Sequence, residues 1–353
     1  MINVLIVEDS PVARELLTYI LTSDPAIRVV GTASNGVEAL EAVRQKKPDV
    51  ITMDIYMPMM DGFEATRRIM ETFPTPIIVV SGHLEGKEVE AAFHAIEAGA
   101  LAAVRRPSGI KHQESEEASK ELIQTVRLMS EIKVVRRTHG ATKARFVAPS
   151  AVSMPLQRTT EIQAVAIGAS TGGPLVLQKI LSGLPQDFPV PVLIVQHIAQ
   201  GFVEGFAEWL SGASRFPVSI ASQGDRVVAG HGYVAPDGFH LGLESGLKIA
   251  LSALPPENGL RPSVSHLFRS TAQVLGPAVI GVMLTGMGKD GAGELRTLKE
   301  GGAITIVQDE ASSVVYGMPG EAIRLDAAVY VLPPETIAAT LVALVKNSKG
   351  KLQ

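Results

Sequence analysis

Cysteine is absent from this sequence of 353 residues. The absence excludes disulfide bonds, a thiol nucleophile and zinc sites built on cysteine, and it is typical of a reducing compartment. An excess of basic residues is also missing, because 32 Lys and Arg face 36 Asp and Glu. The formal net charge of −4 gives no overall attraction to nucleic acid or to an anionic membrane. We therefore expect partners to be recognised at particular sites, with no nucleic acid among them.

Long apolar runs are missing as well. The longest uncharged stretch lies between Arg269 and Lys289, where serine, threonine, glutamine, glycine and proline interrupt it. It falls short of the about 20 apolar residues that span a bilayer, so we expect a buried strand there. The amino terminus reaches Glu8 and Asp9 early, unlike the basic-then-apolar order of a signal peptide. We expect a cytoplasmic protein.

The chain has enough apolar material for two cores, with 46% hydrophobic and 19% charged residues. Its length suits two domains of about 150 residues each. Between them, residues 131–158 are basic and carry prolines and small residues, which predicts a solvated, flexible linker. An anion-binding or partner-binding arm is the alternative for this segment. We predict one domain over residues 1–130 and a second over residues 159–353.

Short apolar runs alternate with amphipathic stretches in both predicted domains. This alternation is typical of α/β folds in which helices cover both faces of a parallel sheet. For the first domain we predict a flavodoxin-like sheet of strand order 2-1-3-4-5. For the second we predict a doubly wound, mostly parallel, Rossmann-like sheet with helices on both faces. In such sheets, ligands bind beyond the carboxyl ends of the strands.

Acidic residues follow the strands of the first domain. Glu8 and Asp9 end the first predicted strand, Asp54 ends the third and Ser81 ends the fourth. Three crowded carboxylates repel one another unless a hard divalent cation joins them, so the pattern predicts Mg²⁺. One carboxylate would then be free to accept a phosphoryl group. Polar strand ends that merely face solvent are the alternative.

The second domain opens with a serine in a glycine turn. Ser170 lies between a predicted strand and a helix that has Pro174 in its first turn, near N–H groups suited to an oxyanion. His197 and Asp290 follow two further predicted strands. The three side chains can supply a nucleophile, a general base and an orienting carboxylate. A helix-capping serine and a structural histidine are the alternatives.

A competing interpretation comes from residues 286–291, which match G-x-G-x-x-G after a strand. Asp309 and Glu310 follow about twenty residues later, as in a dinucleotide-binding site. The match falls late in its domain, however, and it leaves Ser170 and His197 without a role. A P-loop is excluded, since no Gly-Lys-Ser/Thr follows either glycine run.

Three segments of the first domain closely resemble two-component receiver domains: residues 5–10, 53–62 and 78–81. The resemblance implies phosphorylation of Asp54. It also implies Mg²⁺ held by Glu8, Asp9, Asp54 and the Tyr56 carbonyl, with Ser81 holding the phosphoryl group. Two positions depart from the family: Arg106 stands where receivers have lysine, and Ala103 where they usually have an aromatic residue. Arginine keeps the positive charge but differs in shape and reach, so we expect an altered switch.

The second domain resembles the chemotaxis protein-glutamate methylesterase family. The resemblance rests on six motifs, at residues 168–173, 195–197, 234–236, 261–264, 284–292 and 308–319. It implies Ser170 as nucleophile, His197 as base and Asp290 as orienting acid, with the Met287 N–H in the oxyanion hole and Thr171 beside the serine. Departures from the family pattern occur at Ala199, Ser265 and Gly320.

This resemblance implies an enzyme that hydrolyses glutamyl methyl esters on chemotaxis-type receptors, releases methanol and also deamidates receptor glutamines. It implies control by a receiver that a chemotaxis-type histidine kinase phosphorylates. It gives the esterase no cofactor, and we expect a monomer that meets the membrane only through receptors. A phosphosignalling adaptor that binds receptors without catalysis is the alternative.

Overall fold

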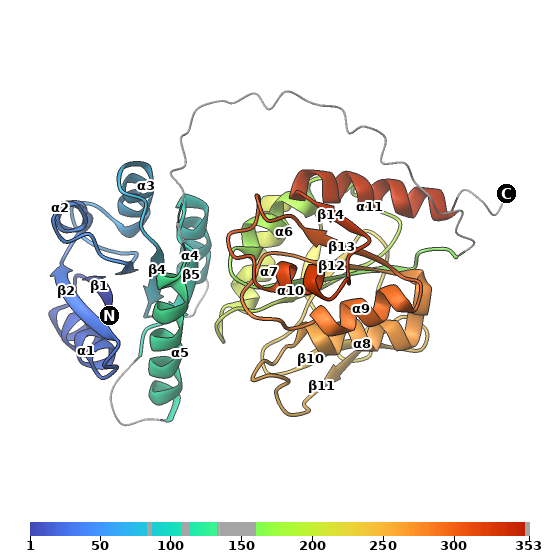
Figure 1. Cartoon of the computed structure of the whole chain (residues 1–353), viewed down its shortest axis with the longest axis horizontal. Coiled ribbons are helices and arrows are strands. Elements are labelled where there is room, and N and C mark those ends of the chain that lie inside the picture. Colours follow the sequence, from blue (N-terminus) through green and yellow to red (C-terminus); the bar gives the residue numbers. More distant parts are fainter. Residues whose placement is uncertain (83–86, 108–112, 133, 135–159, 350–353) are drawn as a thin grey trace. The chain divides into compact units, whose positions relative to one another are not determined.

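The computed structural model describes residues 1–82, 87–107, 113–132, 134 and 160–349. They belong to two compact units, Met1–Ala141 and Thr142–Gln353 (Figure 1). The predicted linker, residues 131–158, lies almost entirely outside the described residues, so its bounds stay a prediction. None of the described helices is both long and apolar enough to cross a membrane.

The first unit alternates strands and helices throughout. Its parallel sheet has the order β2-β1-β3-β4-β5, which confirms the flavodoxin-like order predicted for this domain. The elements are β1 (Ile2–Val7), α1 (Pro11–Thr22), β2 (Ile27–Ala33), α2 (Gly36–Lys46), β3 (Val50–Met53), α3 (Gly62–Thr72), β4 (Ile77–Ser81), α4 (Lys87–Ala98), β5 (Ala102–Arg105) and α5 (Gln113–Ser130).

Local sequence explains where these elements begin. Every residue of β3 and β4 is buried, as expected of central parallel strands covered on both faces. Ser10 caps α1 by accepting a hydrogen bond from the Ala13 N–H, and Pro11 fills the first turn, where no N–H partner is needed. Asp61 caps α3 in the same way. The caps start both helices just beyond the strand ends that bear the acidic residues.

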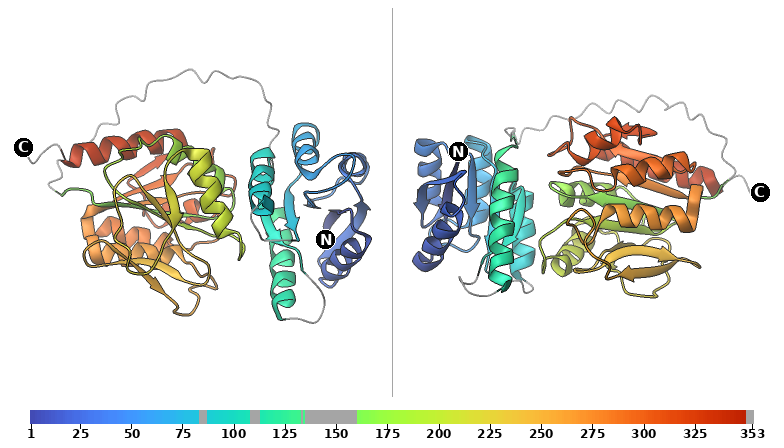
Figure 2. Two further views of the ribbon diagram at one scale, coloured as in Figure 1. Left: turned by 180° about the vertical axis from the view of Figure 1, so that it is seen from behind. Right: turned by 60° about the horizontal axis from the view of Figure 1, so that its bottom comes forward.

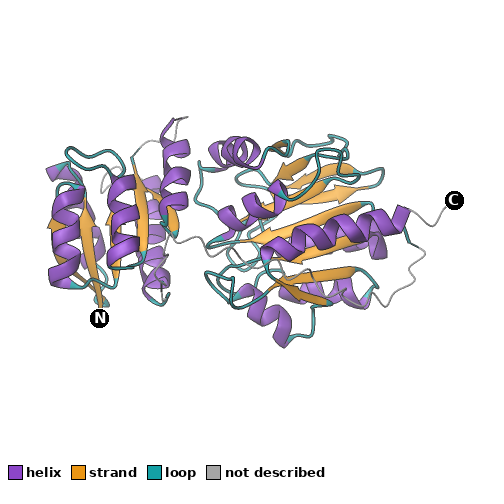
Figure 3. Ribbon diagram, turned by 90° about the horizontal axis from the view of Figure 1, so that it is seen from above, coloured by secondary structure: helices purple, strands orange, loops and turns teal. Residues whose placement is uncertain are grey.

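The second unit contains a sheet of seven parallel strands between helices (Figure 3). Its order is β14-β13-β12-β6-β7-β9-β8, which confirms the predicted doubly wound, Rossmann-like fold. The elements are β6 (Ala164–Ala169), α6 (Gly173–Ser182), β7 (Val192–Gln196), α7 (Val203–Ser214), β8 (Val218–Ile220), β9 (Gly232–Val234), β10 (His240–Glu244), β11 (Lys248–Ser252), α8 (Val264–Leu275), η1 (Gly276–Ala278), β12 (Val279–Met283), α9 (Ala292–Glu300), β13 (Ile304–Gln308), α10 (Met318–Arg324), β14 (Tyr330–Leu332) and α11 (Pro334–Lys349).

The chain leaves β6 for β7 on one side of the sheet and later returns to β12 on the other side. This reversal makes a switch point between β6 and β12. In open α/β sheets, ligands bind at such a point, beyond the carboxyl ends of the strands. The antiparallel pair β10–β11 stands outside the main sheet and packs beside α8 (Figure 2). The buried strand expected between Arg269 and Lys289 is β12, which ends at Met283 and is buried throughout.

Candidate active site and candidate metal centre

The nucleophile turn follows directly after β6. Ser170 is half-buried there, and its N–H donates to the Thr285 carbonyl at 3.0 Å. Gly172 has φ +78°, a left-handed conformation that suits glycine, and it forms the N-cap of α6. Gly173 is required for space, because a Cβ there would lie 2.2 Å from the Gln196 side-chain oxygen. The two glycines let the chain turn tightly enough to present Ser170 just beyond the carboxyl end of β6.

Gln196, the last residue of β7, joins the serine turn to the histidine. Its buried side-chain amide donates to the Ser170 carbonyl and to the His197 carbonyl, both at 2.8 Å. The His197 N–H in turn donates to the Ala169 carbonyl at 2.9 Å, which continues the pairing of β6 with β7. The backbones of the predicted nucleophile and base are therefore fixed to one another.

His197 and Asp290 meet across the switch point. The His197 Nε2 lies 3.0 Å from the Asp290 Oδ2, with 11% of the histidine side chain and 1% of the aspartate side chain exposed. Since Asp290 engages Nε2, the other ring nitrogen, Nδ1, is the one that remains to take a proton. The fold thus brings the loops after β6, β7 and β12, with Ser170, His197 and Asp290, to one edge of the sheet.

The start of α8 surrounds the Asp290 carboxylate with donors. They are the Ser263 hydroxyl at 2.9 Å, the Val264 N–H at 2.6 Å and the Ser265 N–H at 3.2 Å. Burial would raise the pKa of Asp290, but the hydrogen bond and charge of His197 and the donors from α8 lower it to about 2. The carboxylate therefore stays ionised beside the histidine.

The glycine loop after β12 packs tightly against the serine. A Cβ on Gly286 would lie 2.6 Å from the Ser170 Cβ. The N–H groups of Gly317 and Met318 hold this loop by donating to the Gly286 carbonyl at 3.0 and 2.8 Å. Within the described part of the chain, the N–H groups of Thr171 and Met287 donate no hydrogen bond. Two backbone donors therefore remain available near Ser170.

The same packing argues against the dinucleotide interpretation of residues 286–291. Gly286 contacts Ser170, and a Cβ on Gly291 would lie 2.4 Å from the Val264 side chain. The loop also follows β12, a strand beyond the switch point, and not β6, the first strand of the unit. Gly286 and Gly291 thus serve close contacts within the protein.

Sequence reasoning missed the part that α8 plays in this site. Ser263 appeared only inside a matching motif, and Ser265 only as a departure from the family pattern. The available signal was Ser263 as an N-cap, since serine before an amphipathic run commonly begins a helix. Nothing local in the sequence indicated that this helix start would face Asp290, because the two are 26 to 27 residues apart.

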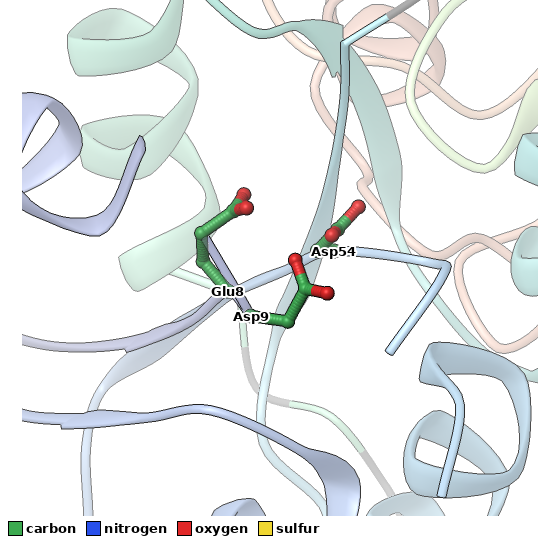
Figure 4. A group of neighbouring side chains, drawn as sticks. All are labelled: Glu8, Asp9 and Asp54. Atoms are coloured by element: carbon green, nitrogen blue, oxygen red, sulfur yellow. The ribbon is translucent and has the colours of Figure 1, made fainter. Parts of the chain in front are cut away.

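The acidic residues of the first unit converge as predicted (Figure 4). Glu8, Asp9 and Asp54 each offer a carboxylate oxygen, and these atoms lie within 4.8 Å of one another. Burial and the negative charge of Glu8 raise the pKa of Asp54 to about 7. Hard oxygen donors that repel one another fit a divalent cation such as Mg²⁺. Tyr56 is in the loop after β3, with its side chain largely exposed.

Arg106 reaches this acidic group from the residue after β5. Its Nη1 donates to both Glu8 carboxylate oxygens, at 3.0 and 2.9 Å. Gly82 makes room for it, because a Cβ there would lie 2.1 Å from the Arg106 Nη2. Ser81 is buried at the end of β4, and its carbonyl accepts the Arg106 N–H at 2.7 Å. Ala103 is buried within β5.

In comparison with protein families, each unit matches a family model. The model of the CheB methylesterase family matches residues 165–341, and the model of the response regulator receiver domain matches residues 4–114. A Geobacter metallireducens protein named protein-glutamate methylesterase/protein-glutamine glutaminase 4 is 56% identical over 98% of this chain and 99% of its own. A protein of the same name, numbered 1, from Syntrophus aciditrophicus is 55% identical over 98% of both chains.

The second unit also resembles a solved structure, the Thermotoga maritima CheB methylesterase catalytic domain. That structure is matched over its full length and covers 53% of this chain, with 38% identity and a TM-score of 0.51.

Proposed function

The chain belongs to the CheB methylesterase family, and from this premise we propose that it hydrolyses glutamyl methyl esters on methyl-accepting chemotaxis receptors and deamidates receptor glutamines. We place this activity in the cytoplasm as part of the same proposal. The observation that carries it is the His197–Asp290 hydrogen bond of 3.0 Å beside the Ser170 turn.

In the first step, His197 takes the Ser170 proton on Nδ1 while the serine oxygen attacks the ester carbonyl. Asp290 stabilises the imidazolium that forms. The N–H groups of Thr171 and Met287 donate to the oxyanion, which is the role their free N–H groups support. As the C–O bond to the methoxy group breaks, His197 returns the proton and methanol leaves an acyl-enzyme on Ser170.

In the second step, His197 removes a proton from water, which attacks the acyl carbon. The bond to Ser170 breaks, the serine regains its proton, and the receptor keeps a glutamate. A carboxamide substrate follows the same course and releases ammonia, because the leaving amine can also take the proton from His197.

In the receiver domain, we propose that Asp54 accepts a phosphoryl group from a histidine kinase of the chemotaxis type. Glu8, Asp9, Asp54 and the Tyr56 carbonyl would hold Mg²⁺, which neutralises charge on the transferring group when it is bound. Ser81 would hold the phosphoryl group on Asp54. Arg106 would supply a positive charge beside the phosphoryl group, although its guanidinium also forms an ion pair with Glu8.

Methanol release from methylated receptor membranes tests the esterase. Ser170→Ala should lower the rate by at least about 10³-fold, since the nucleophile is lost. Ser182→Ala is the matched control, because Ser182 lies at the exposed end of α6 and its hydroxyl donates to the Gln178 carbonyl within its own helix. Release that persists in Ser170→Ala would refute Ser170 as nucleophile.

The adaptor alternative predicts no release from any version of the chain. It also predicts no labelling of Ser170 by a serine-directed fluorophosphonate. Labelling that is present in the wild type and absent from Ser170→Ala would exclude a purely binding role for this unit. An adaptor has no physical need for a serine, a histidine and an aspartate brought together at one edge of the sheet.

A further inference from the structure

We propose that Ser263 is a positioning residue for hydrolysis, whose hydroxyl fixes the Asp290 carboxylate in the orientation that holds the His197 ring. The inference rests on the proposed triad and adds a fourth side chain to it. Ser263 would not touch the substrate. It would act through Asp290 alone.

The contacts of the Asp290 carboxylate carry the first step of the argument. Its Oδ1 accepts from the Ser263 hydroxyl and the Ser265 N–H, at 2.9 and 3.2 Å. Its Oδ2 accepts from the Val264 N–H and His197, at 2.6 and 3.0 Å. A carboxylate has about four lone-pair directions, and here each oxygen has two partners. The group is held against rotation on both sides.

Among the three donors from α8, Ser263 alone donates through its side chain, so a substitution can remove its hydrogen bond without changing the backbone donors. As the N-cap of α8, its oxygen accepts the His266 N–H at 3.4 Å, which leaves its proton for the carboxylate. An ionised carboxylate can only accept, so the direction of the Ser263–Asp290 bond is unambiguous. Ser263 is fully buried, and a lost hydroxyl would therefore leave Oδ1 short of a donor.

Ser265 holds the backbone that carries Asp290. Its hydroxyl accepts the Gly291 N–H at 2.9 Å and donates to Glu294 at 2.8 Å. The start of α8 thus fixes the Asp290 side chain through Ser263 and its backbone through Ser265.

The test compares Ser263→Ala, Ser263→Thr and Ser270→Ala in the full chain. Ser270 is the matched control on the same helix, since its hydroxyl accepts from the Leu243 N–H at 2.8 Å and donates to the Leu243 carbonyl at 3.1 Å. Ser263→Ala should lower kcat for methanol release about 10- to 100-fold, because small misplacements of catalytic groups have effects of this size. KM should change less than about twofold, since substrate is not touched. Ser263→Thr, which keeps a hydroxyl, should restore most of kcat.

A spectroscopic measurement separates positioning from general loosening of α8. The proton between His197 and Asp290 should give a far-downfield NMR resonance in the wild type, which weakens in Ser263→Ala and persists in Ser270→Ala. Wild-type kcat in Ser263→Ala would overturn the inference, as would an equal loss in Ser270→Ala.

Two further variants distinguish a failure of this proposal from misfolding and from a failure of the proposed triad. If Ser263→Ala fails to fold, as judged from Trp209 fluorescence, the folded Ser263→Thr variant decides: kcat within about threefold of wild type supports the proposal, and a loss of 10-fold or more overturns it. Retained activity in Ser170→Ala would instead show that the proposed triad itself is wrong.

Discussion

Two aspartates of this protein stand at the carboxyl ends of parallel strands, yet their surroundings have opposite effects. Asp54 lies among acids, and burial together with the charge of Glu8 raises its pKa to about 7. Asp290 is also buried, but His197 and the donors from α8 lower its pKa to about 2. Burial raises the pKa of both carboxylates, and the difference between them comes from their neighbours.

The difference matches the two proposed tasks. Asp54 would have to be ionised to accept a phosphoryl group, and a site that repels its charge favours a bound cation that neutralises it. Asp290 would have to remain an anion through every turnover, so its donors keep it ionised. The ionised form of Asp54 is destabilised by its surroundings and would be stabilised by a bound cation, whereas the ionised form of Asp290 is stabilised by the protein's own donors.

The largest expected effect is on catalysis at Asp290. Asp290→Asn should lower kcat for methanol release about 10³- to 10⁴-fold, because the amide cannot stabilise the imidazolium and favours the wrong tautomer. Asp309→Asn is the control, since Asp309 follows β13 at the same sheet edge and bonds to Ser312 instead. Equal losses in both variants would contradict a special role for Asp290.

The next largest effect is on stability, because we expect replacement of Asp54 to stabilise its unit. Because the folded-state pKa of Asp54 is raised from 3.8 to about 7, its ionisation costs stability as pH rises through this range. Asp54→Asn should therefore stabilise the receiver by about 2–4 kcal/mol at pH 8 in EDTA. Hydrogen exchange of the β1 and β3 amides, followed as a function of urea concentration, measures the free energy of unfolding of this unit. Saturating Mg²⁺ should reduce the difference in stability between Asp54→Asn and the wild type. An Asp54→Asn variant less stable than the wild type would refute charge repulsion at Asp54.

Asp290→Asn should in turn destabilise the catalytic unit, by about 2 kcal/mol at pH 7. The folded-state pKa of Asp290 lies below its ordinary value of 3.8, so this contribution is present above about pH 4 and is lost as pH falls towards 2. Urea unfolding followed by Trp209, the chain's single tryptophan, reports this unit selectively. A difference that is independent of pH between 2 and 6 would argue against the donors as its cause.

The smallest effect concerns Arg106. Replacing it by methionine removes a cation that partly neutralises Glu8, so the dissociation constant for Mg²⁺ should fall about three- to tenfold. Isothermal titration calorimetry measures this constant. Gly82→Ala should shift Mg²⁺ affinity in the same direction by less, because the added Cβ displaces the Arg106 guanidinium from Glu8. Weaker Mg²⁺ binding in Arg106→Met would show that the arginine helps to build the site.

Much of this architecture was predictable from sequence because its signals are local. The strands and helices of the first unit follow apolar periodicity, and Ser170, His197, Asp290 and Asp54 each follow a strand, a position that topology alone makes significant. The short strands β8, β9 and β14 were not predicted, since three residues carry too little pattern.

The donors to Asp290 were missed for a different reason. Ser263 faces Asp290 only because α8 packs beside β6 and β12, which is a tertiary relation. The pairing of Arg106 with Glu8, 98 residues away, arises in the same way. Sequence patterns predict which strand ends bear chemistry, but the groups that tune this chemistry come from elements that the pattern does not place.

The side chain of Gln196 has a consequence for motion. A sheet flexes as its strands slide and splay by fractions of an ångström, and such flexing would ordinarily change the separation between loops that leave different strands. Here the buried Gln196 amide donates hydrogen bonds to the carbonyls of both Ser170 and His197. When the sheet flexes, both loops are carried along as one body, so that the spacing between nucleophile and base survives movements that shift their common position.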